Sequence, residues 1–170
     1  MKCVFTSTTS VFALGCALIW TTPVFANLPG GGTGTGAAVT LTDNGDGTVT
    51  MANGIISIHI NKTSAVIDQV NYTYNNSGST TTQQVLSGGN NGGQLYWEFG
   101  GFSTGAATYS VVANTADYCE VGMLFDSASS GQVDIHFSMV RGSTGFYVTP
   151  IWIHRSTDSA MSMGECRDNI

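Results

Sequence analysis

The chain has 170 residues, enough for one domain with a sizeable core. Only 9% of the residues are charged and the formal net charge is −6 at pH 7. With five Lys and Arg residues in all, the sequence predicts no binding to nucleic acid and no attraction to an anionic membrane. Because 42% of the residues are hydrophobic and 10% aromatic, the chain does not belong to the disordered class. Abundant Gly with few charges is typical of an all-β extracellular domain.

Residues 1–26 predict a signal peptide, so we expect a secreted protein. An apolar stretch is followed by Val24 and Ala26, which occupy the small positions before a cleavage site. A membrane anchor is the first alternative, but about ten apolar residues are too few to cross a bilayer. Lipid attachment at Cys16 is the second alternative, and it is disfavoured because Ala13 stands where Leu is preferred.

Residues 27–38 are rich in Gly and Thr and predict a flexible leader, which a β-domain over residues 39–170 follows. The sequence DNGDG lies between two segments of alternating polarity and predicts a hairpin turn, since Asn-Gly and Asp-Gly steps adopt positive φ easily. A calcium loop is the alternative. It is disfavoured because Gly45 stands at the third position, where a ligand oxygen is needed.

Further along the chain, apolar and polar side chains alternate in several segments, which predicts strands. The residues expected to face a core are Ile56, Ile58 and Ile60, then Val66, Val70, Tyr72 and Tyr74, then Leu95, Trp97 and Phe99, and then Val133, Ile135, Phe137 and Met139. Residues 75–78 predict a turn, and the polar, Gly-rich residues 77–93 predict a long surface loop. Pro150 indicates that its segment is an edge strand or contains a bulge. Roughly eight to ten strands without a helix predict an antiparallel β-sandwich.

Two cysteines, Cys119 and Cys166, remain after the expected signal peptide. In an oxidising compartment they could form a disulfide. Cys119 also alternates with Val121, Met123 and Phe125, which predicts a small buried apolar side chain instead. The sequence leaves both interpretations open.

No motif in the sequence carries a known chemistry. The three histidines, His59, His136 and His154, have no HxH or HExxH spacing, so we expect no metal site and treat them as solvated or hydrogen-bonded residues. GxSxG, a Walker loop and a dinucleotide fingerprint are missing, and we expect no cofactor. The 11 acidic residues include no pair that the sequence selects for glycoside hydrolysis.

Two stretches suggest binding of a sugar. YWEF places aromatic side chains on both faces of a strand, where exposed rings stack on a sugar; the alternative is that Trp97 and Phe99 belong to the core and only Tyr96 is exposed. Arg167 is one of four basic residues beyond the signal peptide. It is expected either to form a surface ion pair of small energy or to hold a carboxylate with its planar set of donors.

Three segments in this order, VTLTDNGDGTVTMANGIISIHINKTSAVIDQVNY, GGQLYWEFGG and MGECRDNI, resemble the N-terminal domain of rhamnogalacturonan lyases of polysaccharide lyase family 4. The resemblance extends over residues 39–170. It implies a galactose-mutarotase-like β-sandwich and cleavage of the rhamnose–galacturonate backbone of pectin by β-elimination. In such a reaction a base removes the C5 proton of the galacturonate, next to its carboxylate.

The resemblance implies that Arg167, in a GE-x-R motif, binds that carboxylate and favours the enolate-like transition state. The family's Lys base and His acid are expected beyond Ile170, so we expect a fragment of a longer lyase with no catalytic residue of its own. Its partner would be the pectic polysaccharide, which Arg167 and Tyr96 contact, and we expect a monomer. The alternative is a complete small secreted carbohydrate-binding or adhesion β-sandwich without catalysis.

Overall fold

The structure is a computed structural model, and it describes residues 34–86, 93–99, 105–127, 131–160, 164 and 166–169. The expected signal peptide and the beginning of the leader lie outside these residues. The described part contains eleven strands and no helix. The strands are β1 (Thr40–Asp43), β2 (Thr48–Ala52), β3 (Ile56–Asn61), β4 (Ile67–Asn76), β5 (Ser79–Gln84), β6 (Tyr96–Phe99), β7 (Thr108–Asn114), β8 (Tyr118–Ser127), β9 (Gly131–Val140), β10 (Phe146–Ile153) and β11 (Cys166–Asn169).

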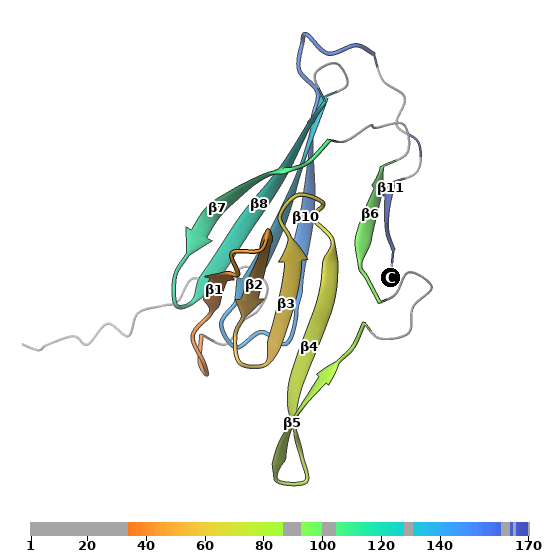
Figure 1. Cartoon of the computed structure of the whole chain (residues 1–170). Coiled ribbons are helices and arrows are strands. Elements are labelled where there is room, and N and C mark those ends of the chain that lie inside the picture. Colours follow the sequence, from red (N-terminus) through yellow and green to blue (C-terminus); the bar gives the residue numbers. More distant parts are fainter. Residues whose placement is uncertain are drawn as a thin grey trace, which may run out of the picture.

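The strands form three antiparallel sheets. One has the order β1-β2-β3-β4-β5, the second has the order β10-β9-β8-β7, and the third consists of β11 and β6. Figure 1 shows the two larger sheets face to face, with the β4–β5 hairpin extending beyond them and the β6–β11 pair at their side. The predicted all-β antiparallel sandwich is therefore confirmed.

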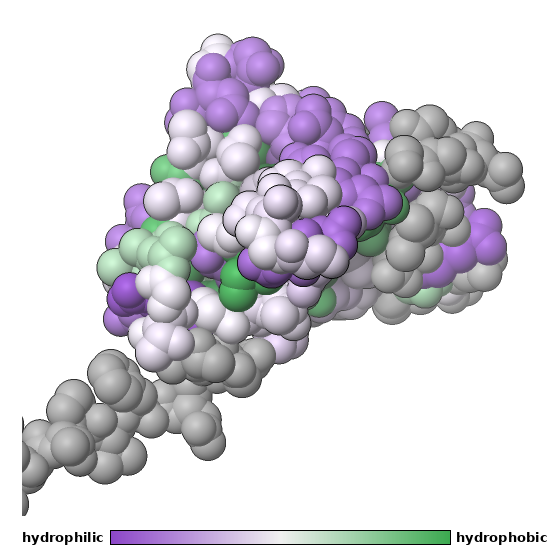
Figure 2. Space-filling view, turned by 90° about the horizontal axis from the view of Figure 1, so that it is seen from below, coloured by the Kyte–Doolittle hydropathy of each residue, from purple (hydrophilic) through white to green (hydrophobic). Residues whose placement is uncertain are grey.

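The core lies between the two larger sheets and consists of the alternate side chains that point inward. The first sheet contributes Val49, Met51, Ile56, Ile58, Ile60, Ile67 and Val70, and the second contributes Cys119, Val121, Met123, Phe125, Val133, Ile135, Phe137 and Met139. Burial of each large apolar side chain contributes about 1.5–3 kcal/mol relative to exposure. The inward faces predicted for β3 and β9 are confirmed, because all their predicted core residues are buried. Figure 2, which views the molecule from below, shows apolar residues as separate patches among hydrophilic and neutral ones.

The predicted inward face of β4 is wrong at its beginning and at Tyr74, which is exposed. Ile67 is fully buried, while Val66 is half-buried and lies before the strand. The cause is a bulge: His59 pairs with Gln69 and Ile60 pairs with Ile67, so Asp68 has no partner in the register. The extra residue shifts the alternation by one position and places Ile67 and Val70 on the same face.

The surface loop predicted over residues 77–93 is also wrong in part. Ser79–Gln84 form β5, which pairs with Asn71–Asn76 of β4. All six of its residues are Ser, Thr or Gln, and none of the six is buried. A strand that is solvated on both faces has no polarity alternation, so the period-two signal could not reveal it. The turn predicted at residues 75–78 is confirmed, with Ser77 and Gly78 at positive φ.

The third sheet is attached to the side of the sandwich through its inner face. Leu95 pairs with Ile67 in an isolated bridge, so the chain entering β6 lies beside the start of β4. Leu95, Trp97 and Phe99 pack against the core, and the Phe99 ring meets the Trp152 ring edge-on at 4.9 Å between centroids. The placement of Trp97 and Phe99 toward the core is therefore confirmed, whereas Tyr96, expected to be exposed, is half-buried.

Asn53 joins the two larger sheets at one end. It lies in the turn between β2 and β3, is 1% exposed, and donates two hydrogen bonds from Nδ2 to the carbonyls of Val140 (2.9 Å) and Ser143 (2.8 Å). Gly54 beside it has φ of +82°, and a Cβ there would lie 2.7 Å from the Cβ of Ala37. The hydrogen bonds thus require Asn53, and the close approach of Ala37 requires Gly54.

Arg141 fixes the described end of the leader. Its guanidinium donates to the carbonyl of Gly36 from Nε (3.0 Å) and Nη2 (2.7 Å), and its own carbonyl accepts from the Gly34 amide at 3.3 Å. The hairpin predicted at DNGDG is present between β1 and β2, where Gly45 and Gly47 have positive φ. The strand with Pro150, β10, lies at the edge of its sheet as predicted.

Candidate functional site

The two residues expected to bind substrate come together on β6 and β11. Arg167 pairs directly with Glu98, and Asn169 pairs with Tyr96. Because opposite residues of antiparallel strands share a face, Tyr96, Glu98 and Arg167 lie on the face opposite to Trp97 and Phe99. We call these three residues the β6–β11 ledge.

An ion pair dominates the charge of this ledge. The Nε and Nη2 atoms of Arg167 donate to one oxygen of Glu98 at 2.8 Å and 2.7 Å. The two side chains are 49% and 44% exposed. An exposed pair of this kind contributes about 0–1 kcal/mol, so another carboxylate can replace Glu98 at small cost. The structure thus shows Arg167 in a surface ion pair. Because this pair is weak, it does not prevent the guanidinium from binding a substrate carboxylate.

A cavity adjoins Tyr96. Its volume is about 390 Å³, within the range of about 300–1,000 Å³ of small-molecule sites, and Ser64, Val66, Gln94 and Trp97 complete its lining. A second cavity of about 280 Å³ shares Ser64 and Trp97 with the first as lining residues. In the part of the chain that the structure describes, the indole Nε1 of Trp97 is buried without an acceptor. Such an orphaned donor is costly, and an acceptor from a bound molecule would relieve that cost.

A second group of polar residues lies on the outer face of β8, β9 and β10. His136 lies between two carboxylates: its Nδ1 is 2.5 Å from Glu120 Oε1 and its Nε2 is 3.1 Å from Asp134 Oδ2. The Tyr118 hydroxyl donates to the other oxygen of Glu120. The residues that line the resulting hollow of about 250 Å³, named here the His136 basin, are Tyr118, Glu120, His136, Ser138, Tyr147, Thr149 and Ile151.

Gly122 gives the imidazole its position. It lies opposite His136 in the β8–β9 register and opposite Ser110 in the β7–β8 register. A Cβ on Gly122 would approach Ser110 Oγ to 3.0 Å, Asp134 Oδ1 to 3.2 Å and His136 Nε2 to 3.5 Å. The missing side chain therefore lets the His136–Asp134 pair lie close to the sheet.

The charges in the basin stabilise one another. Burial alone would lower the pKa of His136, but hydrogen bonds to Glu120 and Asp134 outweigh it and raise that pKa above its usual value. Burial acts to raise the pKa of Glu120, and hydrogen bonds from Tyr118 and His136 outweigh it and lower that pKa. Burial and the hydrogen bond to Glu120 raise the pKa of Tyr118 to about 12. The shifts of His136 and Glu120 thus both favour their charged pair, and Asp134 lies at the other ring nitrogen of His136.

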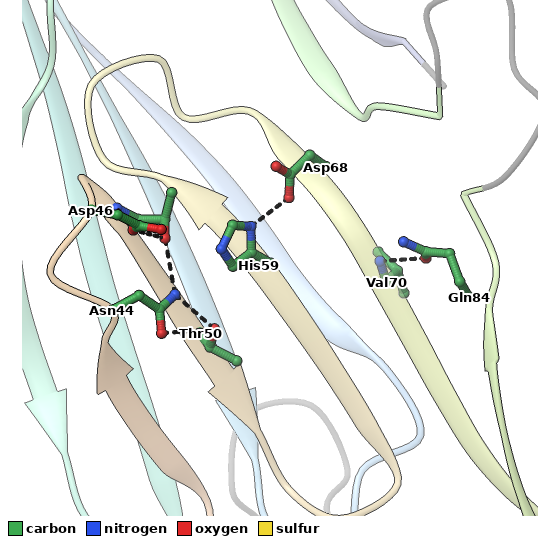
Figure 3. A network of polar contacts seen from close by, with 8 residues as sticks. Asn44, Asp46, Thr50, His59, Asp68, Val70 and Gln84 are labelled. Atoms are coloured by element: carbon green, nitrogen blue, oxygen red, sulfur yellow. Dashed lines mark hydrogen bonds and ion pairs between the residues drawn. The ribbon is translucent and has the colours of Figure 1, made fainter.

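His59 and His154 each contact one polar group. On the outer face of the first sheet, His59 Nδ1 lies 2.5 Å from Asp68 Oδ1, close to the polar contacts of Asn44 with Thr50 (Figure 3). His154 is exposed, with Nε2 at 3.2 Å from the Ser159 carbonyl. The interpretation of all three histidines as hydrogen-bonded residues is confirmed.

The two cysteines lie in different environments. Cys119 is fully buried in the core on β8, and Cys166 is exposed on β11; both are free thiols. The structure therefore places Cys119 as the small buried apolar residue of the second interpretation and does not pair it with Cys166. Burial raises the pKa of the Cys119 thiol to about 12.

Metal binding and membrane crossing would each need a feature in the residues that the structure describes. No group of three or more His, Cys, Asp or Glu side chains there is arranged to hold a metal ion. No segment of these ranges forms a helix with the length and apolarity that a membrane crossing needs.

The chain matches no protein-family model, no curated protein and no solved structure. The resemblance to the rhamnogalacturonan lyases therefore depends on the sequence segments alone, and the function has to be argued from the two sites.

Proposed function

We propose that this chain binds an acidic, pectic polysaccharide at the β6–β11 ledge. The observation that carries the proposal is the shared outward face of Tyr96 and Arg167, two residues that sequence reasoning selected separately. An Arg offers a planar set of donors to a uronate carboxylate, and an aromatic ring stacks on the CH-rich face of a sugar. The adjoining cavity has the size for a sugar unit.

The role of Glu98 follows from charge. In the absence of ligand it holds the guanidinium across the strand pair, which fixes the direction of the donors. A uronate carboxylate arriving at Arg167 competes with Glu98 for these donors and is also repelled by it. Glu98 is therefore expected to lower the affinity for uronate.

In this proposal, the chain contributes substrate binding to the β-elimination of rhamnogalacturonan that the resemblance implies, on a sandwich of the galactose-mutarotase-like kind. β6 and β11 carry neither Lys nor His, so the ledge lacks the Lys base and the His acid that the resemblance implies. The secretion implied by residues 1–26 would bring the protein to a polysaccharide outside the cell.

A second candidate is a carbohydrate-binding or adhesion sandwich without any catalysis. It is favoured by the histidines of the two large sheets, His59 and His136, which are both engaged by carboxylates. The two candidates make the same prediction for binding and differ in the reaction. Since neither candidate places a base and acid in this chain, absorbance from the unsaturated uronate product distinguishes them only when a translation product read past codon 170 is incubated with rhamnogalacturonan.

The binding experiment is calorimetric titration of the chain with rhamnogalacturonan oligosaccharides. We expect Arg167→Gln to weaken binding about 10- to 100-fold, since a hydrogen bond to a charged group contributes about 1.5–3 kcal/mol. Glu98→Gln should instead tighten binding a few-fold. Because both substitutions break the same ion pair, loss of local structure would weaken binding in both, whereas the proposal requires opposite effects.

A further inference from the structure

We infer that the His136 basin is a second carbohydrate site, and that it takes a neutral sugar unit. The inference does not rest on the function proposed for the β6–β11 ledge, because the basin lies on other strands and is built from other residues. It starts from the arrangement of side chains across β8, β9 and β10.

The basin is built in two rows across the sheet. In one row Tyr147 pairs with Ser138, which pairs with Glu120. In the next row Thr149 pairs with His136. Each row thus presents polar groups on one outer face, and the hollow of about 250 Å³ opens between them.

The floor of the basin is fixed before any ligand arrives. Glu120 is held by Tyr118 and His136, and His136 is held in turn by Asp134. The side chains of His136, Glu120 and Asp134 are only 17%, 20% and 25% exposed. A carboxylate oxygen accepts more than one hydrogen bond, so Glu120 retains the capacity to accept from a sugar hydroxyl while it stays in this network. Such a preorganised acceptor costs little entropy on binding.

The rim of the basin is apolar and exposed. Tyr147 and Ile151 lie on the edge strand β10, each with 42% of its surface exposed, and Thr149 between them is also exposed. A sugar has a CH-rich face that packs on an aromatic ring and hydroxyls that reach polar groups around it. The pairing of a polar floor with an exposed Tyr at the rim matches that two-sided chemistry.

The charge of the basin selects the kind of sugar. Glu120 and Asp134 lie on either side of His136, so the acidic groups outnumber the one basic group and a uronate is repelled. A neutral sugar carries no such penalty. The β6–β11 ledge, which contains Arg167, is therefore expected to prefer acidic sugar units. The His136 basin, which contains carboxylates, is expected to prefer neutral ones.

The test is a titration of the full chain with methyl rhamnoside, methyl galactoside and methyl galacturonate, followed by amide NMR shifts and by calorimetry. We expect one of the neutral glycosides to shift resonances of β8, β9 and β10, and methyl galacturonate to leave them unchanged. Tyr147→Ala should weaken neutral binding about tenfold, as expected for a lost stacking contact. Tyr74→Ala, at an exposed Tyr of β4, is the matched control and should have no effect.

Thr149→Val is a second variant, which removes a rim hydroxyl from an edge strand without changing the side-chain shape. It should also weaken neutral binding while the unfolding midpoint stays near that of the wild type. Three results would overturn the inference: no shift of basin resonances with either neutral glycoside, equal shifts with the uronate, or unchanged affinity in both variants. Failure of the ledge would appear separately, as Arg167→Gln without effect on uronate binding.

Discussion

Replacement of Asn53 by Ala tests how the two large sheets are held together. Asn53 is 1% exposed, and its amide group makes four hydrogen bonds to the backbone. Nδ2 donates to the carbonyls of Val140 and Ser143 in the second sheet and its hairpin. Oδ1 accepts from the amides of Ile55 and Ile56 at 3.1 Å and 3.0 Å in the first.

The magnitude follows from these contacts. At about 1 kcal/mol net for each hydrogen bond, Asn53→Ala should lower the free energy of unfolding by about 4 kcal/mol. The loss is a large share of the total of about 5–15 kcal/mol for a typical domain. Asn53→Asp should be at least as damaging, because a carboxylate oxygen would face the two carbonyls that Nδ2 now contacts.

The assay is urea unfolding followed by tryptophan fluorescence. The matched control is Asn44→Ala, at an exposed turn residue whose side chain hydrogen-bonds to the exposed hydroxyls of Thr48 and Thr50, and it should lose less than about 1 kcal/mol. Equal losses for Asn53→Ala and Asn44→Ala would refute the assignment of Asn53 as the link between the sheets.

Three further predictions concern the core, the His136 network and the two cysteines. Phe137→Ala should lower the free energy of unfolding by about 3–5 kcal/mol in urea titrations, since the side chain is fully buried, whereas Val111→Ala at a half-exposed site should change it little; a small loss for Phe137→Ala would contradict the core placement. The raised pKa of His136 means that its stabilising contribution is complete below about pH 6.5 and is lost as the pH rises through the higher folded pKa. Urea midpoints of the wild type should therefore fall more between pH 6 and pH 8 than those of His136→Gln, and parallel curves would count against the network. A thiol reagent followed by peptide mass spectrometry should label Cys166 in the native protein and Cys119 only after unfolding, and early labelling of Cys119 would be inconsistent with its burial.

The sequence predicted those parts of the fold in which one face of a strand is buried. Ile56, Ile58 and Ile60 alternate with polar residues because one face of β3 packs on the core, so the pattern and the burial agree. β5 and β11 could not be found in this way. β5 is solvated on both faces, and the CRDN sequence of β11 contains no alternation that marks a strand.

The two sites were predictable to different degrees. Tyr96 and Arg167 could be named from residue type, but their shared face depends on the pairing of β6 with β11 across 69 residues of sequence from Glu98 to Arg167. The basin was missed because His136 and Glu120 come together only through the β8–β9 register. The alternation in β9 places Asp134 and His136 on the same polar face, but it could not assign Glu120 of β8 to them.

The structure also separates two parts of the resemblance to the lyases. The Asn53-Gly54 step is explained by the link between the sheets and by the close approach of Ala37, which are requirements of the fold. The segments that contain Tyr96 and Arg167 are different, since the ledge residues lie on the outward face. Uronate binding would therefore depend on the two segments that contain Tyr96 and Arg167.

The most direct test of this account compares the affinities of wild type, Arg167→Gln and Glu98→Gln for a rhamnogalacturonan oligosaccharide under identical conditions. Weaker binding by Arg167→Gln together with tighter binding by Glu98→Gln is the predicted result. Unchanged affinity in both variants, or equal weakening in both, would contradict the assignment of the β6–β11 ledge as the uronate site.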